Sequence, residues 1–563
     1  METSKLTVRE NACIIREKSL DYISAPQGLG YEFYHSMLLN RLAIAQIDGA
    51  SGETDTYYNL LRKCIRISIN LLTRGITKDD IICLCTSNHF NSCVPIISGL
   101  FLGVKVAPLD PSLSLDDTTY ILNQIRPRII FVSTDVIEMI EEALEDVGVE
   151  CEIVVFGFCY GFTEIEEFLE PVKNEAKFKP LPVTDVKETA IILFSSGTAG
   201  PSKGICLSHQ ALMIQFINTI SYWNLGQKIY FSNCTKERSE TGLMTAINFA
   251  TYQWMPAVAL LCCSILTATA RIICKTFESE VVWKLIDKYE ISFMSCTSFE
   301  AVQFYKPGKP ERVEGKSLKM LVTSGTALRK SDMLELRKLL PGCFITNAYI
   351  QNEASGLLTM FDVAKPGDIR DQYEEPTSCG KLIPGVTCKI IDPVTGKILG
   401  VNKAGELRYK ADFIMNGYHK LDSSVALDSD GWIKTGDVGL YDEKHRFYVL
   451  DNLRDIFKWK CWHIVPSVLE NVLKEHPAIK EAVVIGIPHE DENIGELAMG
   501  IVSLNKHMRR RVTEKDIENY ANANLTKRQQ LRGGLKIVRQ IPLRPTGKPN
   551  REELIKLVFS EES

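Results

Sequence analysis

The residues from Phe194 to Gly204 have the types and spacing needed to bind a phosphate chain. They combine serine and threonine hydroxyls, several glycines and one lysine, directly after a short apolar run at 191–194. Glycines let successive backbone N–H groups converge on an anion, hydroxyls add uncharged donors, and a lysine supplies positive charge for a polyphosphate. A strand followed by such a loop favours a phosphate site over a surface linker. The predicted phosphate ligands are Ser195, Ser196, Gly197, Thr198, Gly200 and Lys203.

The same loop excludes two common nucleotide-binding motifs. A Walker A loop would need glycine at 202 and serine or threonine at 204, whereas the chain has Ser202 and Gly204. No GxGxxG pattern follows the first predicted strand, so a Rossmann dehydrogenase has no support.

Composition and charge exclude several further classes. The 563 residues are 45% hydrophobic and 24% charged, which excludes a disordered chain, a collagen and a small disulfide scaffold. With 65 basic and 70 acidic side chains, the chain has no broad basic field for nucleic acid. The 17 scattered cysteines form no CxxC pair, and the charged N-terminus has no apolar core. We therefore expect a reducing, intracellular environment and no zinc cluster.

One uncharged stretch, residues 241–270, could be mistaken for a membrane span. It contains polar side chains throughout and Pro256 near its middle. Its most apolar part, residues 256–266, is shorter than the ~20 residues that a span requires. The pattern predicts a buried helix and no membrane span.

Most of the chain alternates between short β-branched runs and longer amphipathic stretches. Residues 81–85, 104–108 and 128–132 are predicted strands, with predicted helices at 91–102 and up to residue 124 between them. This rhythm predicts an α/β fold in which helices wrap parallel sheets. Further strands of the same kind are predicted at 191–194, 270–274, 292–296 and 319–323.

The character of the sequence changes after about residue 377. Glycines and prolines separate short strands over about 378–450, which predicts a small antiparallel or barrel-like β unit. From Pro466 onward, helical and strand patterns alternate again and predict a compact α+β domain. We therefore expect a large N-terminal region, 1–450, and a small C-terminal domain, 451–563.

Taken together, the motifs resemble those of the adenylate-forming superfamily of acyl-CoA synthetases, coumarate–CoA ligases and insect luciferases. Residues 195–204 resemble the family pattern SSGTTGxPKG, and residues 430–437, DGWIKTGD, resemble its DGW…TGD segment. The insect luciferase-like branch is suggested by residues 400–407 and 531–534. Segments 348–353, 405–418 and 545–548 also resemble family motifs, in the family's order.

The resemblance implies an activity in two half-reactions. A carboxylate attacks the α-phosphate of ATP and releases pyrophosphate, and the thiol of CoA then displaces AMP from the acyl-adenylate. By resemblance, Lys548 and Lys203 are catalytic, Glu353 binds Mg²⁺ and also acts in catalysis, and Tyr349 stacks on adenine. Asp437 holds the ribose, with Asn352 and Asn452 also in the nucleotide site. Without the family motifs, Lys548 would be read as a surface lysine and Tyr349 as a core aromatic.

The resemblance also implies that the C-terminal domain is mobile. Asp451 is the expected hinge, on which this domain turns so that one active site serves both half-reactions. Lys458 matches the lysine that the second orientation brings in, although a solvated loop lysine is nearly as plausible from the residues alone.

The expected acid pocket departs from the family pattern. Ile350 and Thr326 stand where the family has glycines, and Asn452 stands where it has arginine. Added bulk should narrow the pocket and favour short or medium aliphatic acids, because packed sites do not absorb extra methylenes cheaply. The predicted pocket residues are Trp254, Gly325, Thr326, Ala348 and Ile350.

The primary functional prediction is an AMP-forming carboxylic acid–CoA ligase that uses ATP, Mg²⁺ and CoA, with a role in fatty acid metabolism. Two alternatives stay open: a weak or inactive luciferase-like relative that binds nucleotide or acyl ligand, and a luciferase-type monooxygenase. We expect a cytoplasmic location, because the C-terminal residues lack the peroxisomal Ser-Lys-Leu signal. The sequence leaves the acid and the oligomeric state open.

Overall fold

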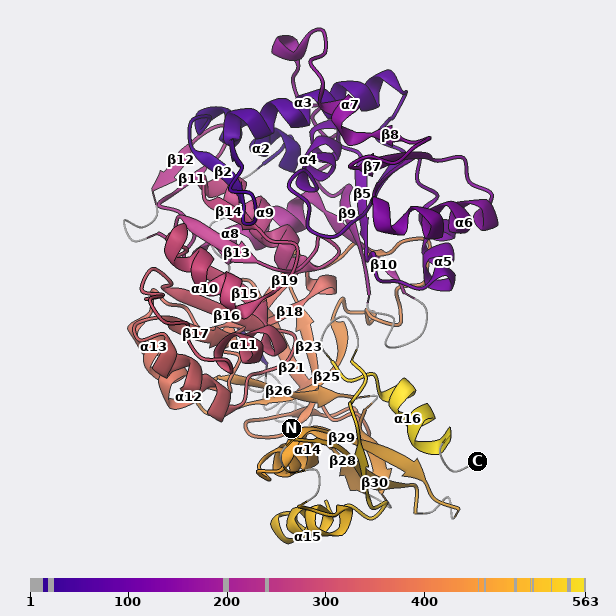
Figure 1. Cartoon of the computed structure of the whole chain (residues 1–563), viewed down its shortest axis with the longest axis vertical. Coiled ribbons are helices and arrows are strands. Elements are labelled where there is room, and N and C mark those ends of the chain that lie inside the picture. The colour runs from indigo at the N-terminus through magenta and orange to yellow at the C-terminus, as the bar shows by residue number, and fades with distance from the viewer. Residues whose placement is uncertain are drawn as a thin grey trace, which may run out of the picture. The chain divides into compact units, whose positions relative to one another are not determined.

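The chain folds into two compact units, drawn in Figure 1. The larger unit contains residues 15–388 and 409–433, and the smaller unit contains 1–14, 389–408 and 434–563. The computed structural model describes residues 14–18, 25–195, 202–237, 242–453, 455–459, 462–490, 494–506, 508, 511–527, 529–543 and 548–560.

An eight-stranded sheet in the larger unit has the order β24-β10-β9-β5-β4-β6-β7-β8. Its centre, β5-β4-β6-β7, is parallel, whereas β10 runs antiparallel to both of its neighbours, β9 and β24. The predicted alternation of strands and helices is confirmed here. Three predicted strands match within one residue, and β9 begins two residues before the prediction. The strands are β4 (Ile81–Cys85), β5 (Lys105–Leu109), β6 (Ile129–Ser133), β7 (Glu152–Phe156), β8 (Thr163–Glu164), β9 (Thr189–Phe194), β10 (Gly204–Ser208) and β24 (Gly417–Tyr418).

Polar N-cap residues mark where two of the helices of this unit begin. The Ser114 side chain accepts a hydrogen bond from the backbone N–H of Asp117 and begins α5, and Ser208 caps α8 in the same way. The apolar faces of α5 and α6 pack on the sheet around Ile130 and Ile140. The helices are α2 (Leu29–Leu39), α3 (Tyr57–Thr73), α4 (Cys93–Leu102), α5 (Leu115–Ile125), α6 (Ile137–Val147), α7 (Ile165–Leu169) and α8 (His209–Tyr222).

A second sheet of the larger unit has the order β17-β16-β15-β13-β14-β2-β3, and only β3 is antiparallel to its neighbour. Its core includes Trp283 stacked on Phe304, with ring centroids 4.3 Å apart. The elements are β2 (Ile44–Asp48), β3 (Thr54–Thr56), β13 (Thr245–Asn248), β14 (Ala270–Ile273), β15 (Phe293–Thr297), β16 (Met320–Ser324), β17 (Phe344–Asn347), α10 (Ser279–Lys288), α11 (Ser298–Tyr305), α12 (Lys330–Leu339) and α13 (Pro366–Glu374).

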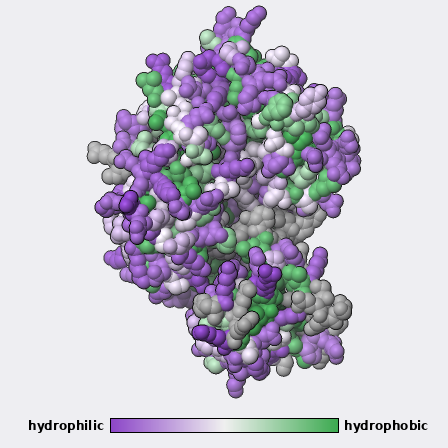
Figure 2. All heavy atoms as spheres, in the orientation of Figure 1, coloured by the Kyte–Doolittle hydropathy of each residue, from purple (hydrophilic) through white to green (hydrophobic). Residues whose placement is uncertain are grey.

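The uncharged stretch at 241–270 contains α9 (Met255–Thr267). Pro256 lies in the first turn of this helix, where a backbone N–H has no intrahelical acceptor and the lack of one in proline costs nothing. Nearly all of its side chains are buried, and it packs against α2 and α8. Across the described residues, no helix has the length and apolar character needed to cross a membrane. The prediction of a buried helix is therefore confirmed. On the face shown in Figure 2, hydrophilic side chains cover most of the surface.

Two small strand groups complete the larger unit. β18 (Tyr349–Gln351), β19 (Gly356–Met360) and β20 (Lys381–Leu382) form an antiparallel sheet, with the short helix η3 (Asn352–Ala354) between the first two strands. β11 (Lys228–Tyr230) pairs with β12 (Thr235–Glu237).

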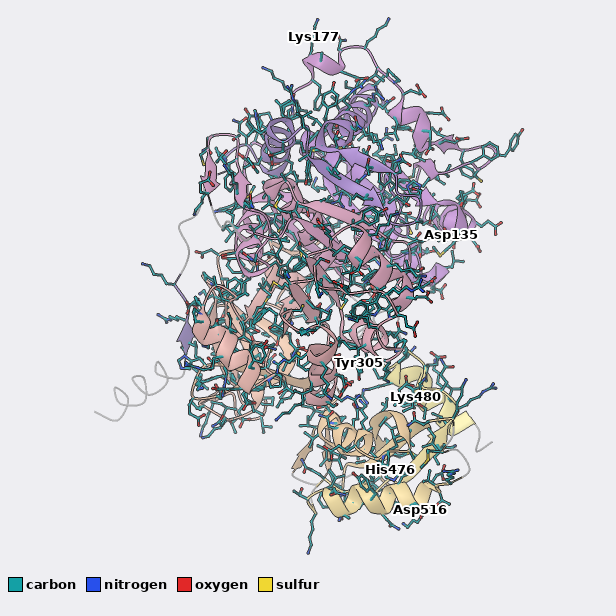
Figure 3. All side chains as sticks on the ribbon, turned by 60° about the vertical axis from the view of Figure 1, so that its left-hand side comes forward. Asp135, Lys177, Tyr305, His476, Lys480 and Asp516 are labelled. Carbon is teal, nitrogen blue, oxygen red and sulfur yellow. The ribbon has the colours of Figure 1, made fainter. Side chains whose placement is uncertain are left out.

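The smaller unit contains a β sheet and an α+β layer. β21 (Thr387–Ile391), β23 (Gly405–Lys410), β25 (Ile433–Tyr441) and β26 (Phe447–Asn452) are successive neighbours in the sheet. In the α+β layer, β29 and β30 are antiparallel, β31 is parallel to β30, and Leu469 and Val484 are buried in the core. Figure 3 labels His476 and Asp516 in this layer. The remaining elements are β22 (Ile398–Leu399), β27 (Phe457–Trp459), β28 (Trp462–Ile464), α14 (Pro466–Lys474), β29 (Ile479–Pro488), β30 (Glu496–Leu504), α15 (Glu514–Asn524), β31 (Leu535–Val538) and α16 (Arg551–Ser560).

The fold class is as predicted: sheets wrapped by helices, a small β unit and a small α+β domain. The division of the sequence at Asp451 and the mobility of residues 451–563 stay predictions.

Candidate active site

The two ends of the predicted phosphate loop are held together by β9 and β10. These strands pair antiparallel with Phe194 opposite Gly204, so the chain must turn between them. The backbone N–H of Ser195 donates to the carbonyl of Lys203 at 3.0 Å, and the N–H of Lys203 donates to the Ser195 hydroxyl, also at 3.0 Å. The loop is therefore closed at its base. Ser196, Gly197, Thr198 and Gly200 lie outside the described residues.

Tyr418 joins the lysine of this loop to the predicted metal ligand. The Lys203 ammonium lies 5.2 Å from the centroid of the Tyr418 ring, within the range of a cation–π interaction. The Tyr418 hydroxyl donates to Oε1 of Glu353 at 3.3 Å. A ring face and a hydroxyl of one side chain thus contact two groups of opposite charge.

Lys203, Tyr418 and Glu353 lie on three separate segments, which backbone hydrogen bonds connect. β24 pairs with β10 in a register that sets Tyr418 opposite Ile205. The N–H of Met415 donates to the carbonyl of Glu353 at 2.8 Å, and the N–H of His419 donates to that of Gly204 at 2.7 Å. The segment around Tyr418 is therefore bound both to the base of the loop and to η3.

The sequence analysis did not select Tyr418, although it lies in a segment, 405–418, that resembles a family motif. Its contacts depend on the pairing of β10 with β24, two strands more than 200 residues apart in the sequence. The available signal was the Gly417-Tyr418 pair at the end of that family-like segment.

The predicted pocket residues follow the carboxyl ends of parallel strands in the seven-stranded sheet. Carboxyl ends of neighbouring parallel strands meet at one edge, where α/β proteins bind ligands. Gly325 and Thr326 follow β16 and are exposed, while Ala348 follows β17 and is buried. Trp254 directly precedes α9, six residues after β13 ends, and is half-buried.

Tyr349 and Ile350 lie side by side on β18 but differ in burial. Tyr349 is buried, with its ring tilted 43° against that of Tyr409 at a centroid separation of 5.8 Å. Ile350 is half-buried, as are Asn352 and Glu353 in the helix η3 that follows. The burial of Tyr349 agrees with either a core aromatic or a ring that stacks on a ligand from one side.

In the smaller unit, Asp437 and Asn452 are directly opposite each other on β25 and β26. The Asn452 amide donates to Oδ1 of Asp437 at 3.1 Å, and the Asp437 N–H donates to the hydroxyl of Thr435 at 3.0 Å. The carboxylate predicted to hold the ribose is thus oriented by a neutral amide. An arginine at position 452 would bring a positive charge instead.

Asp451 connects β26 to the start of α14. Its Oδ2 accepts from the N–H of Ser467 at 2.9 Å, and its Oδ1 accepts from the N–H of Asn452 at 2.9 Å. Burial raises the pKa of the Asp451 carboxyl, and the two backbone hydrogen bonds oppose this shift.

Lys548 is exposed, three residues before the well-held Arg551. The Arg551 guanidinium donates to Glu470 at 2.8 Å and to the carbonyl of Val484 at 2.5 Å, which fixes the start of α16. Lys458 belongs to β27, and its side chain lies outside the described residues.

Within the described residues, no group of three or more histidine, cysteine, aspartate or glutamate side chains could hold a metal ion. A carboxylate such as that of Glu353 fits Mg²⁺, because this ion binds one or two carboxylates together with phosphate oxygens and water.

Comparisons with known proteins identify the family. The model of the AMP-binding enzyme family matches residues 38–419, and that of the AMP-binding enzyme C-terminal domain matches residues 468–548. The chain therefore belongs to the AMP-binding enzyme family, the adenylate-forming superfamily that the motifs resemble.

Relatives of two kinds are similar to the chain. Luciferin 4-monooxygenase of Photuris pensylvanica is 27% identical over 523 residues, covering 91% of each chain. Probable 4-coumarate–CoA ligase 1 of Dictyostelium discoideum is 28% identical over 542 residues, covering 90% of this chain and 91% of its own.

Two solved structures share the fold. The luciferase-like enzyme of the nonluminescent mealworm Zophobas morio is 30% identical with a TM-score of 0.71, over 78% of this chain and 99% of its own. ATP-bound MatB of Rhodopseudomonas palustris has a TM-score of 0.81 over 95% of this chain and 100% of its own, at 18% identity, which shows the fold alone.

Proposed function

We propose that this protein is an ATP-dependent carboxylic acid–CoA ligase. It would activate an acid as acyl-AMP and transfer the acyl group to the thiol of CoA. The observation that carries the proposal is the contact of Tyr418 with both Lys203 and Glu353 beside the base of the phosphate loop. A cation and a carboxylate held together there suit a nucleotide that binds with a divalent metal ion.

In the first half-reaction, a carboxylate oxygen of the acid bonds to the α-phosphorus of ATP and the bond to pyrophosphate breaks. Negative charge on the phosphoryl oxygens must be stabilised, and Lys203 and Lys548 are the cations assigned to this task. Mg²⁺ bound by Glu353 would neutralise further charge on the phosphates.

In the second half-reaction, the CoA thiol adds to the acyl carbon and AMP leaves with the electron pair of the broken C–O bond. Asp437, which the Asn452 amide orients at Oδ1, would hold the ribose hydroxyls, because a carboxylate can accept from both. Asp451 is the proposed hinge and Lys458 the proposed lysine of this step.

Tyr418 is a positioning residue in this account. Its ring limits where the Lys203 ammonium can lie, and its hydroxyl occupies one oxygen of Glu353. Residues that orient a metal ligand in this way affect metal affinity and activity although they touch neither substrate.

The acid site is proposed to prefer short or medium aliphatic acids. Thr326 is exposed and Ile350 is half-buried. Neither side chain is fully buried in the core, so both could line a ligand site. Their bulk, where the family has glycine, would exclude bicyclic acids more than slim chains.

Luciferase-type oxygenation is the second candidate function. It is supported by the luciferin 4-monooxygenase relatives, which cover 91% of this chain at 27% identity. The family's pocket histidine is missing here, since the matching stretch is Tyr252-Gln253-Trp254-Met255. This departure favours the ligase.

A cytoplasmic location is also part of the proposal. Every cysteine in the described residues is a free thiol, and most are buried, which suits a reducing compartment.

One experiment separates these candidates. Acid-dependent exchange of labelled pyrophosphate into ATP reports adenylation, and formation of an acyl-CoA thioester reports the second step. A ligase performs both with at least one aliphatic acid. Light emission with luciferin would indicate the oxygenase, and nucleotide binding without exchange for any acid would indicate an inactive relative.

A further inference from the structure

The guanidinium of Arg271 is buried without a carboxylate partner. Arg271 lies on β14 and is only 4% exposed. It donates to the Tyr252 hydroxyl at 3.0 Å, to Oε1 of Gln46 at 2.8 Å and to Sγ of Cys93 at 3.6 Å. No carboxylate interacts with it anywhere in the described part of the chain. A buried charge in such surroundings is costly unless an opposite charge accompanies it.

The nearest acidic group in this hydrogen-bond network does not supply that charge. Asp55 accepts from the Gln46 amide at 3.1 Å, but it also forms an ion pair with Lys63 at 2.7 Å. The network of Arg271, Gln46, Asp55 and Lys63 therefore has two positive charges and one negative. Burial raises the pKa of Tyr252, so its phenol is neutral.

A small cavity adjoins this uncompensated charge. Its volume is about 20 Å³, and its polar lining comes from Arg271, Tyr252, Asn248 and Asn88. The Asn248 amide nitrogen is buried there with no hydrogen-bond partner in the described residues. The Asn88 amide nitrogen is already used, because it donates a hydrogen bond to the backbone carbonyl of Phe249 at 3.0 Å. The cavity thus combines an unused donor from the carboxyl end of β13 with a buried cation from β14.

We propose that this cavity binds a small monovalent anion of halide size. A halide accepts hydrogen bonds and donates none, so it satisfies both the Asn248 amide and the Arg271 guanidinium. A water molecule could accept from Asn248 but would leave the net positive charge of the network in place. The small volume, about 20 Å³, favours a monatomic anion over phosphate or a carboxylate ligand.

The direct test is diffraction from crystals of the full chain grown with bromide in place of chloride. The expected result is an anomalous peak in contact with the guanidinium of Arg271 and the amide of Asn248. A map without a peak at this cavity, measured on crystals in which other bromide sites are clear, would overturn the proposal.

A solution test uses thermal melting at constant ionic strength, with bromide replacing gluconate. Binding to the folded state alone predicts a saturable rise of about 2–4 °C for the wild type. Asn248→Asp places a carboxylate at the anion position, so its melting temperature should no longer respond to bromide. The control is Asn123→Asp, which adds the same charge beside Arg126 on exposed α5 and should keep the response.

Two outcomes would contradict the proposal in solution. One is a wild type whose melting temperature is unchanged by bromide. The other is an equal, unsaturable response in the wild type and in Asn248→Asp, since that would be a general salt effect. If Asn248→Asp fails to fold, the wild-type diffraction experiment decides alone.

Discussion

The two units hold their candidate nucleotide residues by different means. In the larger unit, an aromatic ring and its hydroxyl contact a lysine and a glutamate, so charged groups are positioned by a neutral side chain. In the smaller unit, a carboxylate is positioned by the amide opposite it on the neighbouring strand. The first arrangement places both charges beside the base of the loop that is proposed to bind a metal-bound polyphosphate. The second orients the carboxylate that is proposed to bind a neutral ligand, the ribose.

The difference matters because substitutions should act on different steps. Residues that hold charges near the phosphates should affect the adenylation rate, whereas residues that hold Asp437 should affect nucleotide binding. The following predictions are arranged from the largest expected effect to the smallest.

Lys548→Ala should reduce adenylation by about 10²–10³-fold while sparing CoA transfer from a supplied acyl-adenylate, because only the first step develops charge on the α-phosphate. Pyrophosphate exchange and thioester formation measure the two steps separately. Lys556→Ala, an exposed lysine on α16, is the control and should leave both unchanged. Equal losses in both half-reactions would refute the assigned role.

Tyr418→Leu should reduce adenylation by about 10–100-fold and raise the Mg²⁺ concentration required, because it removes both the ring and the hydroxyl. Tyr418→Phe keeps the ring and should recover most of the rate, but not the Mg²⁺ affinity. Tyr373→Leu removes a similar ring, 4.3 Å from Arg337, and serves as the control. An unchanged Mg²⁺ dependence in both Tyr418 variants would show that the contact with Glu353 has no role.

The larger unit should lose stability in weak acid. His209 is buried, accepts a hydrogen bond from the N–H of Leu29, and burial lowers its pKa to about 4. In the unfolded chain the histidine pKa has its ordinary value near 6.5. As the pH falls, the unfolded chain therefore binds a proton before the folded protein does. The stabilisation is complete above about pH 6.5 and is lost as the pH falls towards 4, by about 3 kcal/mol in total.

Chemical denaturation of the wild type and of His209→Gln at several pH values checks this effect. Glutamine can still accept from Leu29 but does not titrate, so the variant should show a weaker dependence between pH 6.5 and 4. Parallel curves for the two proteins would mean that other groups cause the acid sensitivity.

In the smaller unit the expected pH dependence has the opposite sign. Burial raises the pKa of Asp451, so the folded state binds a proton more readily than the unfolded state. Its contribution to stability should therefore fall as the pH rises from 3.8 through the raised pKa. Hydrogen exchange of β26 and α14 amides, in the wild type and in Asp451→Asn, would detect it. Exchange that does not differ between the two proteins would contradict this assignment.

The double variant Ile350→Gly with Thr326→Gly should raise the kcat/KM ratio of an aromatic over an aliphatic acid at least about tenfold, because each added group in a pocket is worth about 1–3 kcal/mol of discrimination. The control is Leu334→Gly on exposed α12, outside the predicted pocket. An unchanged ratio would mean that these side chains do not line the acid site.

Sequence reasoning succeeded where the information is local. The strand at 81–85 and the buried helix after Pro256 follow from apolar runs and helix signals. The family motifs also led to the correct family.

The rest depends on contacts between distant segments. Tyr418 reaches Lys203 and Glu353 only because β24 pairs with β10, and no periodicity encodes that pairing. The buried charge of Arg271 and the hydrogen bond from Asn452 to Asp437 likewise need the positions of neighbouring strands. Observed strand boundaries differ from the predicted ones by one or two residues, because the ends of secondary-structure elements are poorly defined by the sequence pattern.

The central claim is that Lys203 and Glu353, held by Tyr418, support adenylation of a carboxylic acid. A single-turnover experiment with wild type, Lys203→Gln and Glu353→Gln, quenched before CoA is added, measures acyl-AMP directly by mass spectrometry. The account predicts acyl-AMP and pyrophosphate in equal amounts from the wild type with a short or medium aliphatic acid, and at least about 100-fold slower formation in both variants. Equal rates in the three proteins, or no acyl-AMP from the wild type with any acid, would contradict it.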